Sequence, residues 1–530
     1  MLFGAASKSL RCDVAVIGGG FGGCAAALAA LRNGMRVVMT EETDWIGGQV
    51  SSQAVPPDEH PWIESFGGTR AYREYRTGVR EYYRRNYPLT ADARRRPFLN
   101  PGDGSVSKLT HEPRVSLAVL EDMLAPYVSG GWLTVLLRHE PIAADTEGDR
   151  IRSVKLKSLE TGVERIVEAP YFLDATEQGD LLPLARVEFV TGFESSKDTG
   201  EPHAPSEAQP SNIQSFTICF AMDYRKGEDH TIDKPEDYAF WRDYVPKMKP
   251  AWPGKLLSWS MSNPQTHEIR NVVFDPEIEN PKKGSLNLWM YRRIASAKNF
   301  TPGAYGSDIT LVNWPQNDYW LGNLHGVSKQ EQQKHVRGGK QLSLSLLYWM
   351  QTEAGFKGLR LRPDITGTDD GLAKYPYIRE SRRIRADFTV LEQHVGTDAR
   401  KPITTAEVFP DSVGIGSYRI DLHPSSGGDN YVDVSSLPFQ IPMGSLIPKR
   451  VENLLAASKN LGVTHITNGC YRLHPVEWNI GEAAGMLTAE AITTRETPRG
   501  IRNQPARLKA FQARLESQGV ELAWPRVTPR

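Results

Sequence analysis

Short apolar runs separated by glycine and polar residues open the chain. Val14 to Ile17 is an apolar run that ends in glycine, which predicts a strand buried in a parallel sheet. Cys24 to Asn33 is rich in alanine and leucine and predicts a helix, and Met35 to Thr40 predicts a second strand. The opening residues therefore predict a strand, a helix and a strand in close succession.

The following segments alternate between loops, helices and strands. Glycine, proline and small polar residues mark the loops, and periodic apolar positions mark the helices and strands. The predicted elements are a loop over Asp44 to Trp62, helices over Arg70 to Tyr87 and His111 to Val128, strands over Trp132 to Leu137 and Ile151 to Leu159, and a strand that runs into a turn and helix over Ala169 to Ala185.

The composition changes near Phe193, where a polar, proline-rich loop begins. The residues beyond it mix short strands and helices, and the buried-strand pattern returns only in NLLAASKNLGVTH, from Asn453. We therefore predict an α/β fold, in which a Rossmann-like nucleotide-binding domain is interrupted by an inserted α+β substrate or cap domain. The predicted boundaries are 10–190 and 436–495 for the two parts of the nucleotide-binding domain, 191–435 for the insertion, and 496–530 for a C-terminal helical arm.

Composition and charge narrow the classes of molecule that the protein is expected to bind. The 530 residues contain 63 Lys and Arg and 63 Asp and Glu, so no net charge favours nucleic acid. No apolar stretch is long enough for a membrane span. The apolar segment at the N-terminus is too short for a secretory signal. The four cysteines lie far apart, which argues against a disulfide framework or a metal site. We expect a cytoplasmic protein that binds a small molecule, with its oligomeric state open.

A glycine turn follows the first predicted strand. Gly18, Gly20 and Gly23 have the G-x-G-x-x-G spacing, which permits a tight turn, close approach to a pyrophosphate and close helix packing. The helix start, including Phe21 and Gly22, points its N–H groups at the phosphates. Glu41 ends the second strand 23 residues after Gly18, where a carboxylate accepts hydrogen bonds from ribose hydroxyls, and Glu42 is the next candidate. A glycine turn that only packs a helix is the alternative.

The number of such turns bears on the kind of nucleotide. There is one G-x-G-x-x-G, and the nucleotide-binding domain is interrupted rather than contiguous. This arrangement suits a flavin that is held between the nucleotide-binding domain and a covering domain. We therefore predict FAD as the resident cofactor.

Several motifs together resemble those of the FAD-dependent oxidoreductase family with a glutathione-reductase-type nucleotide-binding fold. The resemblance covers most of residues 10–495 and rests on the glycine turn, IGGQVSSQ, LDATEQGDLLPLA, NWPQNDY, PYIRESRRI and NLLAASKNLGVTH with RLHPVEWNIGEAAG. It implies that FAD binds through Gly18, Gly20, Gly23 and Glu41. It also implies that the loop with Gly47, Gly48, Gln49 and Ser52 follows the pyrophosphate, ribityl chain and ring.

Two further segments are implied to lie near the cofactor. Ala175 and Thr176 belong to the turn near the pyrophosphate, although this chain has Glu177 where the family often has glycine. The helix expected after Pro475 is implied to start at the pyrimidine end of the flavin, because a helix N-terminus carries partial positive charge. We expect Asn479 and Ile480 to donate backbone hydrogen bonds there.

Three residues are candidates for catalysis. His474 precedes the last helix and is the candidate for handling a proton, with His111 and His465 as weaker alternatives. Arg379 is a candidate for binding a carboxylate or polarising a carbonyl, although charged residues around it can equally form structural ion pairs. Asp318 follows a predicted strand of the insertion, where an ordinary Asx turn is an equal alternative.

The predicted function is that of an FAD-dependent dehydrogenase or oxidase, which takes a hydride from a small organic substrate onto flavin N5 while a base takes the proton. Six tryptophans of the insertion are compatible with a sugar-like or aromatic substrate, or with a core: Trp241, Trp252, Trp259, Trp289, Trp314 and Trp320. A flavin monooxygenase with transiently bound NAD(P)H, and a non-catalytic binding scaffold, are the alternatives.

Overall fold

A five-stranded parallel sheet lies at the centre of one half of the molecule. The structure is a computed structural model that describes residues 8–278 and 285–525. The strand order is β23-β8-β2-β3-β4, and every neighbouring pair is parallel. The strands are β2 (Val14–Ile17), β3 (Val37–Glu41), β4 (Leu133–Leu137), β8 (Tyr171–Asp174) and β23 (Leu454–Ala456). The predicted α/β fold with a parallel sheet is confirmed.

The C-terminal part of the chain returns to this sheet. β23 pairs with β8, so that Leu455 lies beside Leu173 although about half of the chain separates them in sequence. All residues of β2, β3, β8 and β23 are buried, as expected for strands of a parallel sheet that is covered on both faces.

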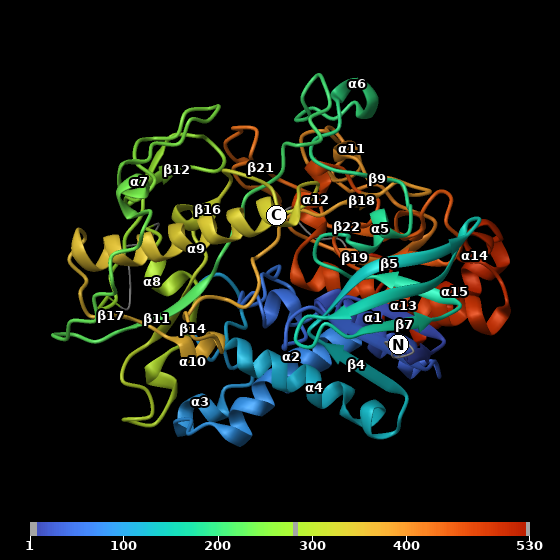
Figure 1. Cartoon of the computed structure of the whole chain (residues 1–530), viewed down its shortest axis with the longest axis horizontal. Coiled ribbons are helices and arrows are strands. Elements are labelled where there is room, and N and C mark those ends of the chain that lie inside the picture. The colour runs from blue at the N-terminus through green and yellow to red at the C-terminus, as the bar shows by residue number, and fades with distance from the viewer. Residues whose placement is uncertain (1–7, 279–284, 526–530) are drawn as a thin grey trace, which may run out of the picture.

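Two helices pack closely together on this sheet. α1 (Phe21–Arg32) follows β2, and α13 (His474–Thr494) lies beside it (Figure 1). A Cβ at Gly481 would lie 2.0 Å from the carbonyl oxygen of Gly22, and one at Gly485 would lie 2.3 Å from that of Ala26. The two helices therefore meet backbone to backbone, which only glycine permits at these positions.

The start of α13 lies close to the prediction. The helix begins at His474 rather than after Pro475, with Leu473 as its N-cap and Pro475 in its first turn. Asn479 and Ile480 thus lie in the second turn, where backbone N–H groups bond to the preceding turn of the helix. The expectation that these two residues donate backbone hydrogen bonds to the cofactor is therefore wrong.

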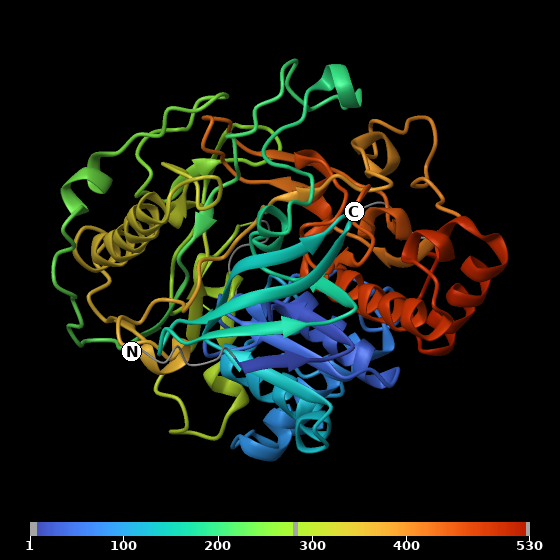
Figure 2. The same cartoon turned by 45° about the vertical axis from the view of Figure 1, so that its right-hand side comes forward.

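A meander of β5, β6 and β7 connects β4 to β8. With β1 it forms a second sheet in the order β1-β7-β6-β5, which lies in front of the parallel sheet in Figure 2. β1 pairs parallel with β7, and the other pairs are antiparallel. The strands are β1 (Lys8–Arg11), β5 (His139–Glu147), β6 (Arg150–Ser158) and β7 (Glu164–Glu168).

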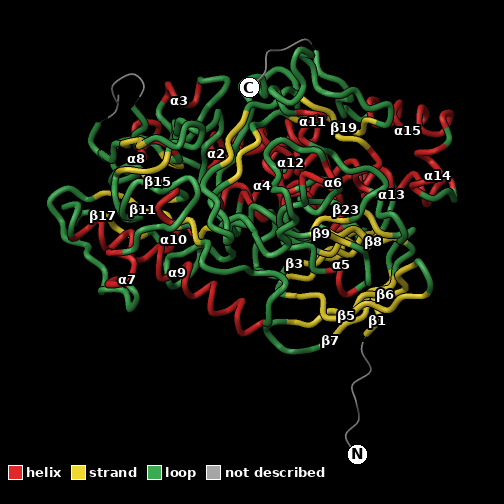
Figure 3. The backbone as a smooth tube through the Cα atoms, turned by 90° about the horizontal axis from the view of Figure 1, so that it is seen from above, coloured by secondary structure: helices red, strands yellow, loops and turns green. Residues whose placement is uncertain are grey.

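A second apolar core is built from residues between Phe216 and Ile378, with Tyr431. An antiparallel sheet in the order β14-β15-β11-β17 divides its apolar residues between this core and that of the parallel sheet, and the long helix α9 packs in the second core (Figure 3). Five of the six tryptophans singled out above are buried in it, and Trp259 packs against its edge. Its elements are β11 (Phe220–Tyr224), β14 (Arg293–Ala295), β15 (Ile309–Val312), β17 (Leu359–Leu361) and α9 (Lys329–Thr352).

Helices and short strands complete the described chain. α2 and α4 correspond to the two helices predicted before residue 130. The elements are η1 (Gly48–Val50), α2 (Arg70–Asn86), α3 (Ala91–Arg95), α4 (Pro113–Ser129), α5 (Leu181–Leu184), β9 (Phe189–Val190), α6 (Ser196–Thr199), β10 (Phe216–Thr217), α7 (Tyr238–Asp243), β12 (Ser260–Ser262), β13 (Ile269–Asn271), α8 (Leu288–Tyr291), η2 (Ala297–Asn299), η3 (Pro315–Asn317), β16 (Asp318–Tyr319), α10 (Pro363–Thr366), β18 (Arg383–Ile384), α11 (Glu392–Val395), β19 (Ser412–Gly416), β20 (Ile420–Leu422), β21 (Val432–Val434), β22 (Phe439–Pro442), η4 (Met443–Leu446), α12 (His465–Tyr471), α14 (Pro498–Asn503) and α15 (Pro505–Ser517).

None of the described helices is both long and apolar enough to cross a membrane.

The helix contact gives the first testable prediction. Gly481→Ala places a methyl group against the backbone of α1, which cannot move aside as a flexible side chain can. We expect the free energy of unfolding, measured with urea, to fall by about 1–3 kcal/mol. Thr494→Ala, at the exposed end of the same helix, serves as the control. An unchanged free energy for Gly481→Ala would contradict the backbone contact.

Candidate functional site

A first cavity lies at the carboxyl ends of β2, β3 and β8. Open α/β sheets bind their ligands at this edge. Gly18 takes φ +103°, and a Cβ there would lie 2.3 Å from the carbonyl oxygen of Ala175, so glycine is required. Eight of the predicted cofactor-binding residues line the cavity: Gly18, Gly20, Glu41, Glu42, Gly48, Ser52, Ala175 and Thr176.

The first turn of α1 supplies hydrogen-bond donors beside this cavity. The N–H of Gly22 donates to a carboxylate oxygen of Glu477 at 3.3 Å. The N–H groups of Gly20 and Phe21 have no acceptor among residues 8–278 and 285–525. Such free donors, with the partial positive charge of the helix N-terminus, suit a phosphate group.

Glu41 is held at the end of β3 by three hydrogen bonds. Its carboxylate accepts from the N–H of Gly19 at 3.2 Å, and from the N–H and hydroxyl of Thr43 at 2.9 and 2.8 Å. Burial raises the pKa of Glu41 to about 7, against the effect of the bonds from Thr43. The carboxylate lines the cavity, where it has capacity to accept a further hydrogen bond from a ribose hydroxyl.

Charged side chains lie against the glycine turn. The carboxylate of Glu177 lies where a Cβ on Gly20 would meet it at 2.7 Å, and it forms an ion pair with Lys459. Burial raises the pKa of Glu177, and one of its carboxylate oxygens has no hydrogen-bond partner in the described structure. Lys459 also lies 3.9 Å from Glu477, so a single lysine faces two buried carboxylates. The residue that departs from the family pattern is therefore compensated by a neighbouring cation.

Residues 47–58, called the strap from here on, connect this cavity to a second one. Gly47 and Gly48 take φ +106° and +49°, and a Cβ on Gly48 would lie 2.9 Å from the Cα of Gly20. The amide of Gln49 donates to the carbonyl oxygen of Arg472 at 3.0 Å and contacts Glu477. Gly48 and Ser52 line the first cavity, whereas Asp58 lines the second.

The second cavity is larger, and it is lined by residues of both apolar cores. Aromatic and charged side chains make up most of its wall. They are Tyr291, Trp314, Tyr377, Tyr418 and Tyr431, five arginines (Arg270, Arg292, Arg379, Arg419 and Arg472), three aspartates (Asp58, Asp421 and Asp433) and His423. These residues come from segments that are far apart in the sequence.

The structure brings together two of the predicted catalytic residues. Arg379 donates to Asp318 at 2.8 Å, and both side chains are almost fully buried. Asp318 also accepts from the hydroxyl of Thr217 and contacts Nδ1 of His423 at 2.6 Å. Burial acts to raise the pKa of Asp318, but Arg379 and His423 outweigh it, so the pKa lies below its ordinary value. Asp318 is therefore a buried carboxylate held in its ionised form.

Arg472 forms the corresponding contact at the strap side of the cavity. It donates to the carboxylate of Asp421 at 3.1 Å and to the hydroxyl of Tyr377 at 3.4 Å. Asp421 lies 3.5 Å from Nε2 of His423. Burial acts to raise the pKa of Asp421, but His423 and Arg472 hold it well below its ordinary range. His423 is thus placed between two carboxylates.

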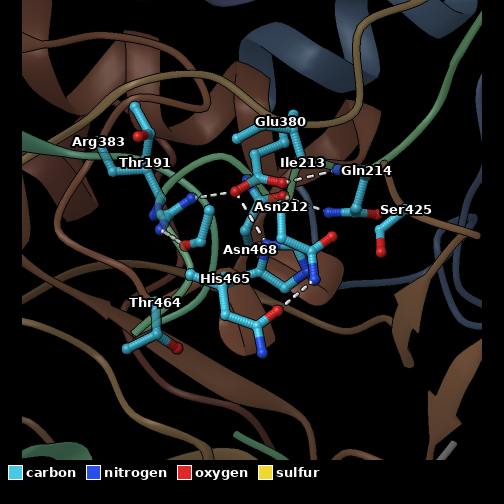
Figure 4. Close-up of polar contacts among 12 residues, drawn as sticks. Thr191, Asn212, Ile213, Gln214, Glu380, Arg383, Ser425, Thr464, His465 and Asn468 are labelled. Carbon is cyan, nitrogen blue, oxygen red and sulfur yellow. Dashed lines mark hydrogen bonds and ion pairs between the residues drawn. The ribbon is translucent and has the colours of Figure 1, made fainter. Parts of the chain in front are cut away.

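The other charged residues of the PYIRESRRI segment have a structural role (Figure 4). Glu380 contacts Arg383 and accepts from Nδ1 of His465 at 2.9 Å, and it also accepts from the N–H of Gln214 at 3.0 Å. Burial acts to raise the pKa of Glu380, but His465 and Arg383 lower it to about 2. This fixed cluster anchors the segment from which Arg379 reaches the second cavity.

His474 lies in neither cavity. Its Nδ1 accepts from the N–H of Asp58 at 3.0 Å, and burial lowers its pKa to about 4. Its Nε2 is buried with no partner among the described residues, beside the ring of Phe21. A neutral His474 therefore has one free N–H to offer. His111 is bonded to Ser116 at 2.6 Å and to the backbone of Leu109 at 3.0 Å.

The remaining predicted cofactor residues contribute to packing. Phe21 lies in an aromatic cluster 4.9 Å from Trp478, and a Cβ on Gly23 would lie 2.1 Å from the carbonyl oxygen of Gly18. The amide of Asn479 bonds to the backbone of β19 at Val413 and Ile415.

Sequence reasoning missed several residues of the second cavity: Asp58, Arg292, Asp421, His423 and Arg472. Of these residues, Arg472 is the one that the local sequence could have indicated, because it lies directly before the predicted helix. No group of three or more His, Cys, Asp or Glu side chains is arranged to hold a metal ion in residues 8–278 and 285–525.

A known protein family matches nearly the whole chain. The family described as FAD dependent oxidoreductase matches residues 13–515. No curated protein matches.

Solved structures match at low similarity. OxyS anhydrotetracycline hydroxylase from Streptomyces rimosus is 11% identical with a TM-score of 0.32, over 96% of this chain and 66% of that one. The flavin-dependent monooxygenase PieE is 14% identical with a TM-score of 0.26, and the match covers 41% of this chain and 36% of PieE. The myxobacterial chondrochloren halogenase CndH is 20% identical with a TM-score of 0.21, over 40% and 43%. The matched regions thus span less than half of PieE and of CndH.

The raised pKa of Glu41 predicts a pH effect on the nucleotide-free protein. Because the folded-state pKa of about 7 exceeds the ordinary 4.5, stability is lost as the pH rises from 4.5 to 7 and the buried carboxyl ionises. Glu41→Gln removes this loss. Between about pH 5 and about pH 8, we expect the free energy of unfolding of the variant to rise relative to wild type by about 1–3 kcal/mol.

Chemical denaturation at the two pH values measures this difference. Glu160→Gln, at a largely exposed carboxylate, is the matched control and should follow the wild type. Equal pH dependence in wild type and Glu41→Gln would show that Glu41 is not the titrating group.

Proposed function

The chain belongs to the FAD-dependent oxidoreductase family, and on this premise we propose that it oxidises a small organic substrate held in the second cavity, whose hydride passes to N5 of FAD. One observation carries the proposal: the Asp318–Arg379–His423 group lies at a cavity that the strap connects to the glycine turn. When bound, FAD supplies the acceptor for the hydride and its two electrons.

The residues of the first cavity fit the adenosine diphosphate part of FAD. Gly18 and Gly20 leave room for a pyrophosphate, the free N–H groups of Gly20 and Phe21 are its donors, and Glu41 accepts from the ribose. The strap then leads toward Tyr377 and Arg472 at the second cavity. We infer that the ring end of FAD lies along the strap, and that residues 191–435 form the domain that covers the substrate.

His423 is the residue that we assign to the proton. Because the carboxylate of Asp318 is ionised, it only accepts hydrogen bonds, so the proton of the contact at 2.6 Å lies on Nδ1 of His423. This holds a proton on Nδ1, and we assign proton exchange with the substrate to Nε2, which faces the carboxylate of Asp421 at 3.5 Å. His423 has a partly exposed side chain that lines the cavity, whereas His474 is fully buried outside it.

Arg379 positions this pair. It lies 2% exposed and donates to Asp318, to the hydroxyl of Thr217 at 2.9 Å and to the carbonyl oxygen of Ser215 at 3.0 Å. Its positive charge keeps Asp318 ionised in a buried position, where an unpaired carboxylate is unstable. The arginine therefore acts on the reaction through the tautomer of His423.

The experiment begins with the purified, FAD-loaded protein. Loss of the blue absorbance of flavin under anaerobic conditions identifies substrates in a panel of alcohols, hydroxy acids, amines and sugars. With the best substrate, His423→Gln should slow flavin reduction about 10²- to 10⁴-fold and remove the dependence of the rate on pH. Binding of FAD should be unchanged, because His423 is not in the first cavity.

His230→Gln provides the control, since the side chain of His230 is partly exposed near Glu228 and lines neither cavity. A His423→Gln enzyme with the wild-type rate and pH profile would contradict the assignment. Flavin reduction that requires NAD(P)H with every compound of the panel would favour a monooxygenase instead.

A further inference from the structure

The arginines of the second cavity differ in whether an aspartate pairs with them. Four of them have an aspartate partner: Arg292 with Asp58 at 3.1 Å, Arg379 with Asp318 at 2.8 Å, Arg472 with Asp421 at 3.1 Å, and Arg419 with Asp433. The side chain of the fifth, Arg270, has no ion pair or hydrogen bond to any residue within 8–278 and 285–525, and its backbone pairs with Met261 in the sheet of β12 and β13. The cavity therefore carries one uncompensated positive charge at its wall.

Arg270 lies at the outer rim of the cavity. It is in β13, which pairs with β12 to form a two-stranded sheet whose residue Ile269 is largely exposed. Arg270 itself is half-buried, whereas Arg379 and Arg472 are each only 2% exposed. A ligand that enters the cavity thus passes Arg270 before it reaches the inner residues.

The inner wall has more hydrogen-bond donors than acceptors. Six buried donor groups of the lining residues have no partner in the described structure: Nδ2 of Asn313, Nε of Arg292, Arg379 and Arg472, Nε1 of Trp314 and the hydroxyl of Tyr431. Buried donors are rarely left without an acceptor, because each one costs free energy. A ligand rich in oxygen acceptors would satisfy them.

The rest of the wall favours a flat, apolar ligand body. Tyr291, Trp314 and Tyr377 line the cavity together with these donors. Aromatic side chains of this kind pack against ring faces and other planar groups.

We propose that the substrate of this site is an organic acid with an aromatic or other planar body, whose carboxylate is bound by Arg270 while its oxygen at the reacting carbon meets the inner donors. This inference rests on the proposed function for the identity of the site as the substrate site. Arg270 here is a binding residue at a distance from the reacting atoms. A carboxylate at the rim leaves the other end of the molecule directed at His423.

Benzoate and its neutral isostere benzamide are the probes of this proposal. Titration calorimetry on the FAD-loaded protein measures their affinity, and the flavin absorption spectrum, recorded in parallel, reports whether they bind near the ring. We expect benzoate to bind more tightly than benzamide. Arg270→Gln should lower the affinity for benzoate about five- to tenfold and leave the affinity for benzamide unchanged. The loss is moderate because the contact between the arginine and the carboxylate lies at a partly solvated rim. Arg270→Lys should restore part of the affinity.

Arg337→Gln is the matched control, because Arg337 is an exposed arginine of α9 whose side chain is 69% exposed. Circular dichroism checks that each variant is folded. Absence of benzoate binding, equal affinity for benzoate and benzamide, or an Arg270→Gln variant with wild-type affinity would each overturn the proposal.

The calorimetric and spectral results separate this inference from the proposed function. Benzoate binding that depends on Arg270 and perturbs the flavin spectrum supports both. Binding that depends on Arg270 without any spectral change supports the anion site, and it counts against the placement of the flavin beside the second cavity.

Discussion

The backbone contact between α1 and α13 is the constraint on which the site depends. Gly481 lies against the carbonyl oxygen of Gly22, so that the helix that follows the glycine turn and the helix that follows Arg472 have one fixed relative position. A side chain at either contact would separate the two helices. The nucleotide end and the strap end of the site are thus positioned by packing that involves no functional group, and β23 ties the same C-terminal segment to the sheet.

Buried charge is the second organising feature of the molecule. Asp318 and Asp421 are held ionised by Arg379 and Arg472, and His423 lies between them. Buried ion pairs contribute little net stability, since desolvation offsets most of their attraction. Their consequence here is a defined protonation state at the cavity wall. The Glu380 cluster in Figure 4 has the complementary role, because it fixes the chain next to Arg379.

Local patterns in the sequence predicted the parts of the structure that are themselves local. The parallel strands around the glycine turn and the buried Glu41 follow from a continuous stretch of chain. His423 was not predicted, because its partner Asp318 lies 105 residues away and no spacing rule connects them. The start of α13 was placed after Pro475, close to its observed start at His474, because the proline in the first turn is a local signal even though the N-cap, Leu473, has no side chain that accepts a hydrogen bond.

The central claim is that FAD extends from the first cavity along the strap to the second. A crystal structure of the FAD-loaded protein tests it most directly. We expect the adenosine ribose beside Glu41, the pyrophosphate at the N–H groups of Gly20 and Phe21, and the flavin ring between the strap and the cavity that contains Tyr377 and His423. A flavin ring that is separated from the second cavity by protein, or a ribose that does not contact Glu41, would contradict the account.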